Sequence, residues 1–278
     1  MENSQVMSTF DLIAFDMDGT LLSTDKKILP SSIEAIHAAV EAGKIVALST
    51  GRCVPEIDLY RDELKEVRYV ICLSGALIYD NLTKEVIHSC VIPKETVFSI
   101  LSQTKDLDLM VHILSDLSIV QADQERRMKD FKMGVYQEMF DLLSTRTDDI
   151  AQYYDANEPN VYKLNLYLTN QNDRDLLKSR FSTLPVTLAD GEITALECSP
   201  LHVSKGSGLI RLCEYIGIPV SAAIAVGDSH NDLDILRTAG LSIAMGNSKK
   251  HVREIADVLV DDNDHSGCAQ AIYQYLLS

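Results

Sequence analysis

The chain has 278 residues and a formal net charge of −16, with 46% hydrophobic and 24% charged residues. An acidic chain without clustered Lys and Arg is unsuited to sequence-independent binding of nucleic acid or of anionic lipid, so both partner classes are excluded. The length is ample for a large hydrophobic core and favours two domains.

Neither a secretion signal nor a membrane span is predicted. The N-terminal residues, MENSQVMST, contain no basic stretch and no apolar run, and no later apolar run reaches the roughly 18 residues that cross a membrane. The six cysteines form no C-x-x-C pair, which is typical of reduced, structural cysteines. We therefore expect a cytoplasmic protein, either monomeric or homodimeric.

The first predicted element is a short apolar strand, residues 12–15, that ends in two aspartates. Asp16 and Asp18 follow it, and Gly19 and Thr20 come next. Two carboxylates so close at the end of a buried strand cost free energy unless a cation or a proton lies between them. A strand followed by an ordinary polar turn is the alternative, because Asp-Gly is common in turns.

A β-α-β unit follows the aspartates. Ser31 and Glu34 have the spacing of a capping box that begins a helix, and residues 44–49 form a buried strand after it. Such a unit implies a parallel sheet, in which binding sites lie beyond the carboxyl ends of the strands. Thr50 is therefore expected beside Asp16.

The residues after this second strand suit a phosphoryl group. Thr50 can donate a hydrogen bond to a phosphoryl oxygen, and Gly51 lets the backbone come close. The alternative is that residues 49–51 cap the next helix, in which Pro55 suits the first turn. Arg52 either attracts an anionic substrate or bonds to loop carbonyls, and its type alone does not separate these roles.

The middle of the chain has a different pattern. After a strand over 69–73 and a hairpin over 77–91, short alternating strands lie between helical stretches from about 93 to 196. Within residues 161–168, apolar residues alternate with Lys163, Asn165 and Tyr167, which predicts a sheet with one buried and one exposed face. Residues 144–160 are polar and are predicted to be mobile. The predicted strands are 109–114, 117–121, 161–168, 186–189 and 193–197.

The first residue of the amphipathic helix predicted over residues 205–217 is a lysine. Lys205 opposes the helix macrodipole, at a cost of roughly 0.3–1 kcal/mol, which a neighbouring phosphate or carboxylate would offset. An ammonium group that simply reaches solvent is the alternative. The next buried strand, residues 222–226, leads into Asp228, Asn231 and Asp232.

These acidic groups predict a metal site. If the sheet is parallel, Asp228 lies near Asp16 and Asp18, and such a cluster calls for a hard divalent cation, with Mg²⁺ the best match. The predicted ligands are Asp16, the backbone carbonyl of Asp18, and Asp228. Asp232 and Asn231 are assigned to supporting positions or to phosphate contacts. His230 is expected to face solvent, and the elements that follow complete a doubly wound sheet.

Four segments in this order resemble the haloacid dehalogenase-like superfamily of aspartate-nucleophile phosphatases, and within it the Cof-type sugar-phosphate phosphatases. They are DMDGT (16–20), STGR (49–52), Ser204-Lys205-Gly206 and GDSHND (227–232), so the resemblance covers nearly the whole chain. One position departs from the pattern, because Ser74 stands where Cof-type sequences have Asn. Serine has a shorter reach, which weakens any substrate contact carried over to this position.

The resemblance implies a doubly wound, Rossmann-like α/β core (1–88 and 195–278) and an inserted α+β cap (89–194) that closes over the substrate. It also implies a Mg²⁺-dependent phosphomonoester hydrolase. Asp16 would be the nucleophile, Asp18 the general acid and base, and Thr50 and Lys205 would neutralise charge on the phosphoryl oxygens. The residues expected to bind phosphate or substrate are Gly19, Thr50, Gly51, Arg52, Ser74, Lys205 and Asn231.

A small phosphorylated metabolite is the expected substrate, with sugar phosphates first and nucleotides and phosphorylated cofactors also open. Two alternatives to a phosphatase are retained. A phosphosugar mutase of the same superfamily would use the same aspartate and would require a bisphosphate. A non-catalytic metabolite-binding regulatory protein on the same fold would turn over no ester at all.

Overall fold

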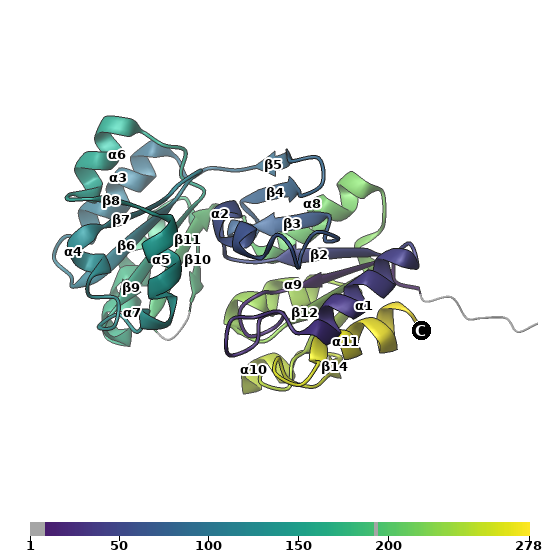
Figure 1. The fold of residues 1–278 in the computed structure, drawn as a ribbon. Coiled ribbons are helices and arrows are strands. Elements are labelled where there is room, and N and C mark those ends of the chain that lie inside the picture. Colours follow the sequence, from purple (N-terminus) through teal and green to yellow (C-terminus); the bar gives the residue numbers. More distant parts are fainter. Residues whose placement is uncertain (1–8, 192–193) are drawn as a thin grey trace, which may run out of the picture. The chain divides into compact units, whose positions relative to one another are not determined.

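The computed structural model describes residues 9–191 and 194–278, and their contacts divide the chain into two compact units (Figure 1). Each unit has its own sheet and its own hydrophobic core. The first unit contains the residues up to Gly51, Tyr60–His88 and Ser204–Ser278, and the second contains Arg52–Leu59 and Ser89–Val203.

Among the described residues, the first unit contains an eight-stranded sheet in the order β14-β13-β12-β1-β2-β3-β4-β5. Strand β1 (Leu12–Phe15) lies between β12 (Ala223–Gly227) and β2 (Ile45–Ser49) and is parallel to both. The neighbouring strands from β14 to β3 are all parallel, and the pair β3–β4 is antiparallel, so the sheet is mainly parallel. The remaining strands are β3 (Tyr69–Cys72), β4 (Leu77–Asp80), β5 (Glu85–Ser89), β13 (Leu241–Ala244) and β14 (Val258–Leu259).

Helices cover both faces of this sheet, which confirms the predicted doubly wound α/β core. Helix α8 (Lys205–Ile216) and helix α9 (Leu233–Thr238) pack together over one core cluster, whereas α1 (Pro30–Glu41) and α11 (Gly267–Ala271) contact each other on the other face (Figure 1). The short helix α10 (Lys250–Arg253) and a π-helical turn, Ile272–Leu276, complete the unit.

The capping box predicted for α1 is wrong. The N-cap residue is Leu29, which has no side chain able to accept a hydrogen bond, and Ser31 lies inside the helix. Pro30 explains the start instead, because its fixed φ suits the first helical turn and it has no N–H that needs a partner.

The second unit, within the same limits, contains a six-stranded sheet in the order β10-β11-β9-β6-β7-β8. Its centre is antiparallel, with β9 (Lys163–Leu168) between β6 (Leu109–Leu114) and β11 (Ala195–Pro200). The predicted domain boundaries, 1–88, 195–278 and 89–194, stay a prediction, but contacts place β11 in the second unit because it pairs with β9 and β10. The strand predicted over residues 193–197 begins at residue 193, which lies outside the described residues. The other strands are β7 (Ser118–Gln121), β8 (Ser144–Thr147) and β10 (Val186–Asp190).

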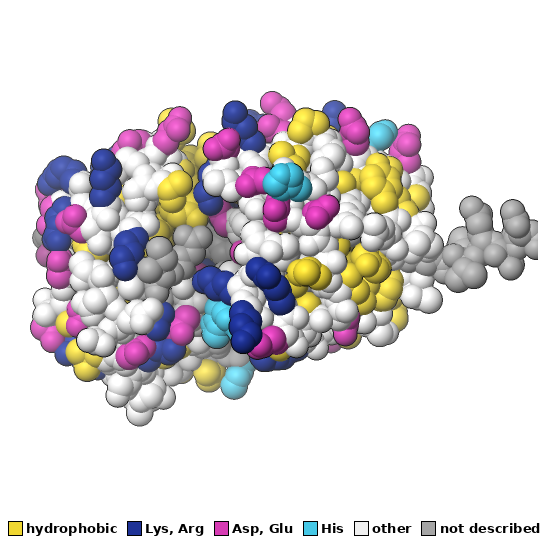
Figure 2. Space-filling view, turned by 90° about the horizontal axis from the view of Figure 1, so that it is seen from below, with side chains coloured by type: hydrophobic (Ala, Val, Ile, Leu, Met, Phe, Trp, Pro, Cys, Tyr) yellow, Lys and Arg dark blue, Asp and Glu magenta, His cyan; other side chains and the backbone are white. Residues whose placement is uncertain are grey.

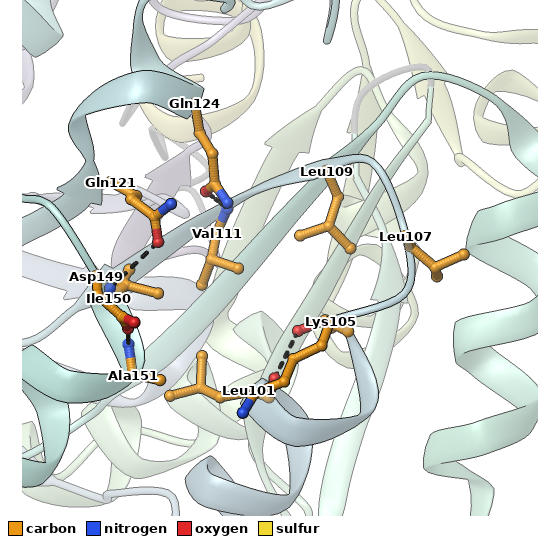
Figure 3. Close-up of a pocket in the computed structure, with 11 residues that line it drawn as sticks. Leu101, Lys105, Leu107, Leu109, Val111, Gln121, Gln124, Asp149, Ile150 and Ala151 are labelled. Atoms are coloured by element: carbon orange, nitrogen blue, oxygen red, sulfur yellow. Dashed lines mark hydrogen bonds between the residues drawn. The ribbon is translucent and has the colours of Figure 1, made fainter.

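Three helices pack on one face of the second sheet, over its larger apolar cluster. They are α3 (Lys94–Gln103), α6 (Ile150–Asn157) and α7 (Gln171–Arg180). A cavity of about 430 Å³ lies beside α3 and α6, lined by aliphatic side chains together with Gln121, Gln124 and Asp149 (Figure 3). Residues 144–160 include β8 and α6, and Asp149 accepts from two backbone N–H groups at the start of that helix, whereas their mobility stays a prediction.

The other face of this sheet was predicted to be exposed, and that prediction is wrong. Every residue of β9 is buried, with Lys163 1% exposed and Asn165 and Tyr167 each 9% exposed. Residues of α5 (Gln137–Leu143) and of the segment after α4 (Ala122–Glu125) pack against part of this face. Helix α2 (Val54–Ile57) contacts α5. Periodicity within one strand carries no information about a segment that covers it.

In the part of the chain that is described, no helix is both apolar and long enough to cross a membrane. All six cysteines are free, and all but Cys90 are buried, as predicted for structural cysteines. On the face shown in Figure 2, basic and acidic side chains are interspersed.

Candidate active site

Polar side chains gather in the first unit where three neighbouring parallel strands end. Asp16 follows β1, Thr50 follows β2 and Asp228 follows β12. Because the strands are parallel, their carboxyl ends lie at one edge of the sheet. The backbone N–H of Asp16 donates to the carbonyl of Val226 (3.0 Å), and that of Ser74 donates to the carbonyl of Thr50 (2.9 Å). These bonds hold the ends of the strands together.

Lys205 is buried among carboxylates. Its Nζ donates to Asp16 Oδ1 at 2.7 Å and to Asp232 Oδ1 at 2.6 Å. The residue is only 1% exposed although it begins α8, whose N-cap Ser204 accepts from the N–H of Ser207. The alternative in which the ammonium group reaches solvent is therefore wrong, and the carboxylates offset its unfavourable place at the helix start.

The carboxylates around Lys205 are crowded. One oxygen each of Asp16, Asp228 and Asp232 lies within 4.8 Å of the others. Burial, followed by repulsion from Asp232, raises the pKa of Asp16 well above its ordinary value and that of Asp228 to about 7. Burial alone would lower the pKa of Lys205, but attraction by Asp16 and Asp232 raises it. Lys205 thus offsets only part of the negative charge of the three carboxylates, and this donor set fits a hard divalent cation such as Mg²⁺.

Asp232 is already engaged by the protein. Its Oδ2 accepts from the backbone N–H groups of Asp228 and Ser229, both at 3.0 Å, and its Oδ1 accepts from Lys205. Asp16 and Asp228 are therefore the carboxylates better placed to bind a cation. Asn231 lies in the same turn, where its Oδ1 accepts from Ser229 Oγ at 2.7 Å.

The loop after β1 passes very close to Asp228. Gly19 has a φ of +81°, and a Cβ at this position would lie 2.6 Å from Asp228 Oδ2. A larger residue would therefore displace the carboxylate as well as strain the backbone. Thr20 follows, and its Oγ1 donates to Asp228 Oδ1 at 3.0 Å. Thr20 was not among the predicted site residues, and it orients a predicted metal ligand.

Asp18 has a different partner from Asp16. Its Oδ1 accepts from Lys26 Nζ at 2.8 Å, and its side chain is 22% exposed. Lys26 lies in a tight turn with a φ of +58°, where its N–H donates to the carbonyl of Ser23 at 2.9 Å. The two aspartates of the motif, which are separated by one residue, thus lie in different electrostatic environments, with Asp16 buried beside Lys205 and Asp18 paired with Lys26.

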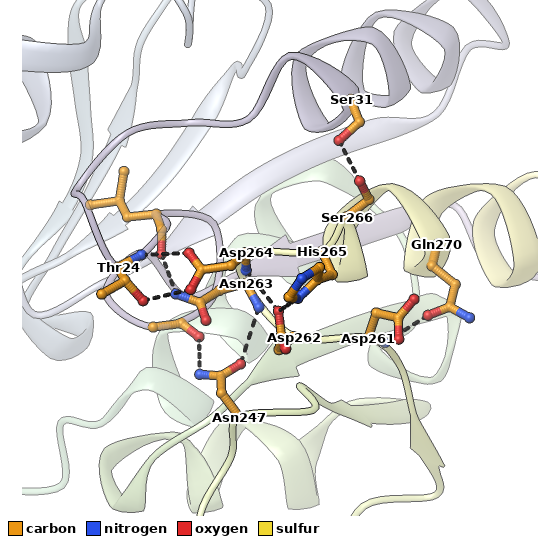
Figure 4. Close-up of polar contacts among 12 residues, drawn as sticks. Thr24, Ser31, Asn247, Asp261, Asp262, Asn263, Asp264, His265, Ser266 and Gln270 are labelled. Atoms are coloured by element: carbon orange, nitrogen blue, oxygen red, sulfur yellow. Dashed lines mark hydrogen bonds and ion pairs between the residues drawn. The ribbon is translucent and has the colours of Figure 1, made fainter.

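A C-terminal loop, residues 261–266, is bonded to the loop that follows β1 (Figure 4). Asn263 Nδ2 donates to the carbonyl of Leu22 at 2.9 Å. Asp264 accepts from the N–H and the Oγ1 of Thr24, at 2.8 and 2.7 Å. These two hydrogen bonds from Thr24 lower the pKa of Asp264. Sequence reasoning missed these residues, although the acidic run at 261–264 was the available signal.

Asn247 connects the two loops from a second position. Its Nδ2 donates to the carbonyl of Gly19 at 2.8 Å, and its Oδ1 accepts from the N–H of Asn263 at 3.2 Å. The backbone on both sides of Thr20 is therefore held by side chains from the end of the chain.

Arg52 and Ser74 were predicted to contact the substrate. Arg52 belongs to the second unit and is 7% exposed, with its Nη1 3.4 Å from Met139 Sδ. Ser74 lies in the first unit with a φ of +56°, a region that Asn enters more readily than most residues. The Asn of the Cof-type pattern would therefore suit this backbone.

Two minor expectations are also settled. The N-cap of α2 is Cys53, so the alternative that residues 49–51 cap this helix is wrong. His230 is exposed as expected, with its ring centroid 5.4 Å from that of His251.

The chain is similar to proteins of known family. A family model for haloacid dehalogenase-like hydrolases matches residues 13–272. Phosphatase YwpJ of Bacillus subtilis is 27% identical over 95% of this chain and 99% of its own length. The 5-amino-6-(5-phospho-D-ribitylamino)uracil phosphatase YcsE of the same species is 25% identical over 96% of each. A solved haloacid dehalogenase-like hydrolase from B. subtilis superposes with a TM-score of 0.86 at 25% identity, covering 95% of this chain and 99% of that one.

Proposed function

The chain belongs to the haloacid dehalogenase-like hydrolase family, and on this premise we propose that it is a Mg²⁺-dependent phosphatase that hydrolyses small phosphate monoesters through a phosphoryl group on Asp16. Sugar phosphates are the favoured substrates. The observation that carries the proposal is the cluster at the strand ends, where Lys205 Nζ lies 2.7 Å from Asp16 Oδ1 and Asp228 is close by.

In the first step, an Asp16 oxygen attacks phosphorus as the bond from phosphorus to the leaving oxygen breaks. Lys205, already bonded to Asp16, and the Thr50 hydroxyl neutralise charge on the phosphoryl oxygens. When bound at Asp16 and Asp228, with the Asp18 carbonyl as a further ligand, Mg²⁺ adds positive charge at the same oxygens. The proposed roles of Gly19 and Gly51 are to let the backbone approach the phosphoryl group.

The second step regenerates Asp16. Asp18 protonates the leaving alcohol in the first step and then accepts a proton from the water that attacks the aspartyl phosphate. Its partial exposure supports this role, because a general acid and base needs access to both the leaving group and water. The name of YcsE supports a sugar-like ester, since a ribityl phosphate is a polyol phosphate.

A phosphate-release screen over many metabolites in the presence of Mg²⁺ tests the proposal. We expect turnover of p-nitrophenyl phosphate and faster turnover of a subset of sugar or polyol phosphates. Activity that requires a bisphosphate and yields an isomerised monophosphate would instead identify a mutase. A complete lack of turnover on the panel would favour a binding protein.

Chelation should abolish the activity. We expect dialysis against EDTA to stop turnover of p-nitrophenyl phosphate and added Mg²⁺ to restore it, because the clustered carboxylates of Asp16 and Asp228 repel each other. The initial rate before and after readdition is the measurement. Full turnover in excess EDTA after dialysis would contradict the metal dependence.

The contact between Asp264 and Thr24 should affect the rate of hydrolysis, although neither residue is proposed to touch the substrate. We expect Asp264→Ala to lower kcat by about tenfold or more, because Thr24 lies in the turn that holds Lys26 against Asp18, and small displacements of catalytic groups are costly. Asp264→Asn keeps one acceptor and should recover much of the loss. Asp261→Ala, at an exposed residue of the same loop, is the matched control. A change confined to KM would contradict this positioning role.

A further inference from the structure

Three backbone carbonyls in the loop after β1 are bound by side chains from the last part of the chain. The bonds run from Asn247 Nδ2 to the carbonyl of Gly19 (2.8 Å), from Cys268 Sγ to that of Thr20 (3.3 Å) and from Asn263 Nδ2 to that of Leu22 (2.9 Å). Donor and acceptor are separated by between 228 and 248 positions in the sequence. The conformation of this loop therefore depends on residues near the other end of the chain.

The same three peptide groups are also bound on their N–H side, within the loop itself. The donors are the N–H groups of Thr20, Leu21 and Ser23, and the acceptors are the carbonyls of Met17, Asp16 and Lys27, at 3.3, 3.2 and 2.8 Å. Each of these peptide planes is thus held at both ends, once from within the loop and once from the C-terminal segment. Rotation of such a peptide group breaks at least one backbone hydrogen bond, which costs free energy and fixes the loop.

The two donors closest to Thr20 are themselves well defined. Asn247 Oδ1 accepts from the N–H of Asn263 at 3.2 Å, so that Nδ2 faces the Gly19 carbonyl (Figure 4). Cys268 is 2% exposed, and burial raises the pKa of its thiol far above the ordinary value, so the thiol keeps the proton that it donates to Thr20.

The Asp228 carboxylate lies against the two peptide groups that these donors hold. Thr20 Oγ1 donates to Asp228 Oδ1 at 3.0 Å, and Thr20 is only 1% exposed. The Gly19 backbone passes so close to the other oxygen, Oδ2, that a Cβ on Gly19 would lie 2.6 Å from it. The carboxylate is therefore confined between the Thr20 hydroxyl and the Gly19 backbone, and a shift of the Gly19–Thr20 peptide would move it.

This arrangement bears on two of the groups that are proposed to bind Mg²⁺. One is the Asp228 carboxylate, and the other is the Asp18 carbonyl, which belongs to the peptide group directly before the Gly19–Thr20 peptide. Residues that orient metal ligands change the affinity for the metal about 10–100-fold when they are replaced. The C-terminal side chains are therefore in a position to affect cation binding without touching the cation.

We propose that Asn247 and Cys268 are positioning residues that set the affinity of the active site for Mg²⁺, because they hold the peptide groups on either side of Thr20. This inference rests on the proposed function and deepens it, since it adds two residues to the support of the metal site. Neither residue is proposed to contact the substrate, because the donor of each is used by a backbone carbonyl.

The test measures Mg²⁺ binding directly, by isothermal titration calorimetry of the full chain after removal of metal by a chelator and without substrate. Asn247→Ala removes the donor to Gly19 at an exposed position, where the fold should tolerate it. We expect the Kd for Mg²⁺ to rise about tenfold. The Mg²⁺ concentration that gives half-maximal hydrolysis of p-nitrophenyl phosphate should rise by the same factor, whereas kcat at saturating Mg²⁺ should change less.

Cys268 offers a matched pair of variants at a buried position. Cys268→Ser keeps a donor to the Thr20 carbonyl, whereas Cys268→Ala removes it, and both replacements lack the sulfur atom. We expect Cys268→Ala to raise the Kd for Mg²⁺ and Cys268→Ser to keep it close to that of the unsubstituted protein. The difference between the two variants reports the hydrogen bond, separately from the change in packing.

Asn81→Ala is the control for a general loss of stability. Asn81 Nδ2 also donates to a backbone carbonyl, that of Val67, at 3.1 Å. It follows β4, and because β4 is antiparallel to β3, Asn81 lies at the edge of the sheet opposite the candidate site. We expect this variant to melt at a lower temperature and to bind Mg²⁺ with an unchanged Kd.

A double-mutant cycle tests whether the effect passes through Thr20. Thr20→Val removes the hydroxyl group that binds Asp228 and keeps the shape of the side chain. In this background, Asn247→Ala should raise the Kd for Mg²⁺ by a smaller factor than in the unsubstituted protein, since both changes remove support from the same carboxylate. Fully additive effects would contradict this route.

The outcomes separate this inference from the function on which it rests. An unchanged Kd in both Asn247→Ala and Cys268→Ala, with Mg²⁺ still bound by the unsubstituted protein, would overturn the positioning role and leave the phosphatase intact. An equal rise of the Kd in Asn81→Ala would attribute the effect to lost stability and would also overturn it. Absence of Mg²⁺ binding by the unsubstituted protein would instead overturn the proposed metal-dependent function itself.

Discussion

Asp16→Asn should reduce hydrolysis of p-nitrophenyl phosphate by on the order of 10⁴-fold or more, comparable to removal of other enzymatic nucleophiles. An amide is a poor nucleophile toward phosphorus. The change also removes a charged oxygen from the group that includes Asp228, and weakens cation binding there. Both the attack and its electrostatic support are thus lost, so raising the Mg²⁺ concentration should not restore the rate.

The control for this variant is the same substitution a few residues earlier. Asp11 lies just before β1 with its side chain 55% exposed, 3.5 Å from Lys44 Nζ. Asp11→Asn should retain nearly full activity, because it removes only a surface ion pair. Cooperative thermal melting of both variants would show that each is folded. Normal turnover by Asp16→Asn would contradict the proposed mechanism.

Asp18→Asn should separate the two chemical steps. Nitrophenolate is a stable leaving group, so the first step needs little help from a general acid, whereas the water of the second step still needs a base. We expect a burst of nitrophenolate close to one equivalent per chain, followed by turnover slower by about 10²–10⁴-fold. A phosphoryl group should therefore accumulate on Asp16.

Rapid mixing followed by acid quench measures both phases. The trapped phosphoryl group should survive acid and be released by hydroxylamine, as an acyl phosphate is, and peptide mapping should place it on Asp16. Asp25→Asn, at a residue next to Lys26 in the turn, is a control that should show no burst. A label on another residue, or a steady state without a burst in Asp18→Asn, would contradict the assignment of Asp18.

The core of the fold was predictable because its signals are local. Each central strand is a short apolar run, each is followed by polar residues, and parallel pairing then brings the ends of those runs together. Parallel pairing thus predicts that Asp16 and Asp228 lie near each other, as they do in the structure. The polar face of β9 was not predictable, because Lys163 and Asn165 are buried by residues and partners that lie elsewhere in the chain.

The candidate site likewise contains residues that the sequence predicted and residues that it did not. Asp16, Lys205, Asp228 and Asp232 lie together as expected, and their roles stay predictions until the variants are measured. Asp264 had no local signal beyond an acidic run, since its partner Thr24 is 240 positions away. Hydrogen bonds between distant loops depend on the whole topology, and no motif or periodicity encodes them.

The position of β1 between β2 and β12 has a consequence for biosynthesis. During translation, β1 and β2 are made first, but the strand on the other side of β1 emerges only after the second unit has been made. All six described strands of the second sheet lie before β12, so that sheet can form its hydrogen bonds while the backbone groups on one edge of β1 are still unpaired. Once the second unit has folded, the chain between β2 and β12 is shorter and less flexible than an unfolded connection would be. Less chain entropy is therefore lost when β12 pairs with β1. The order of synthesis thus favours an insert that folds early over one that folds late.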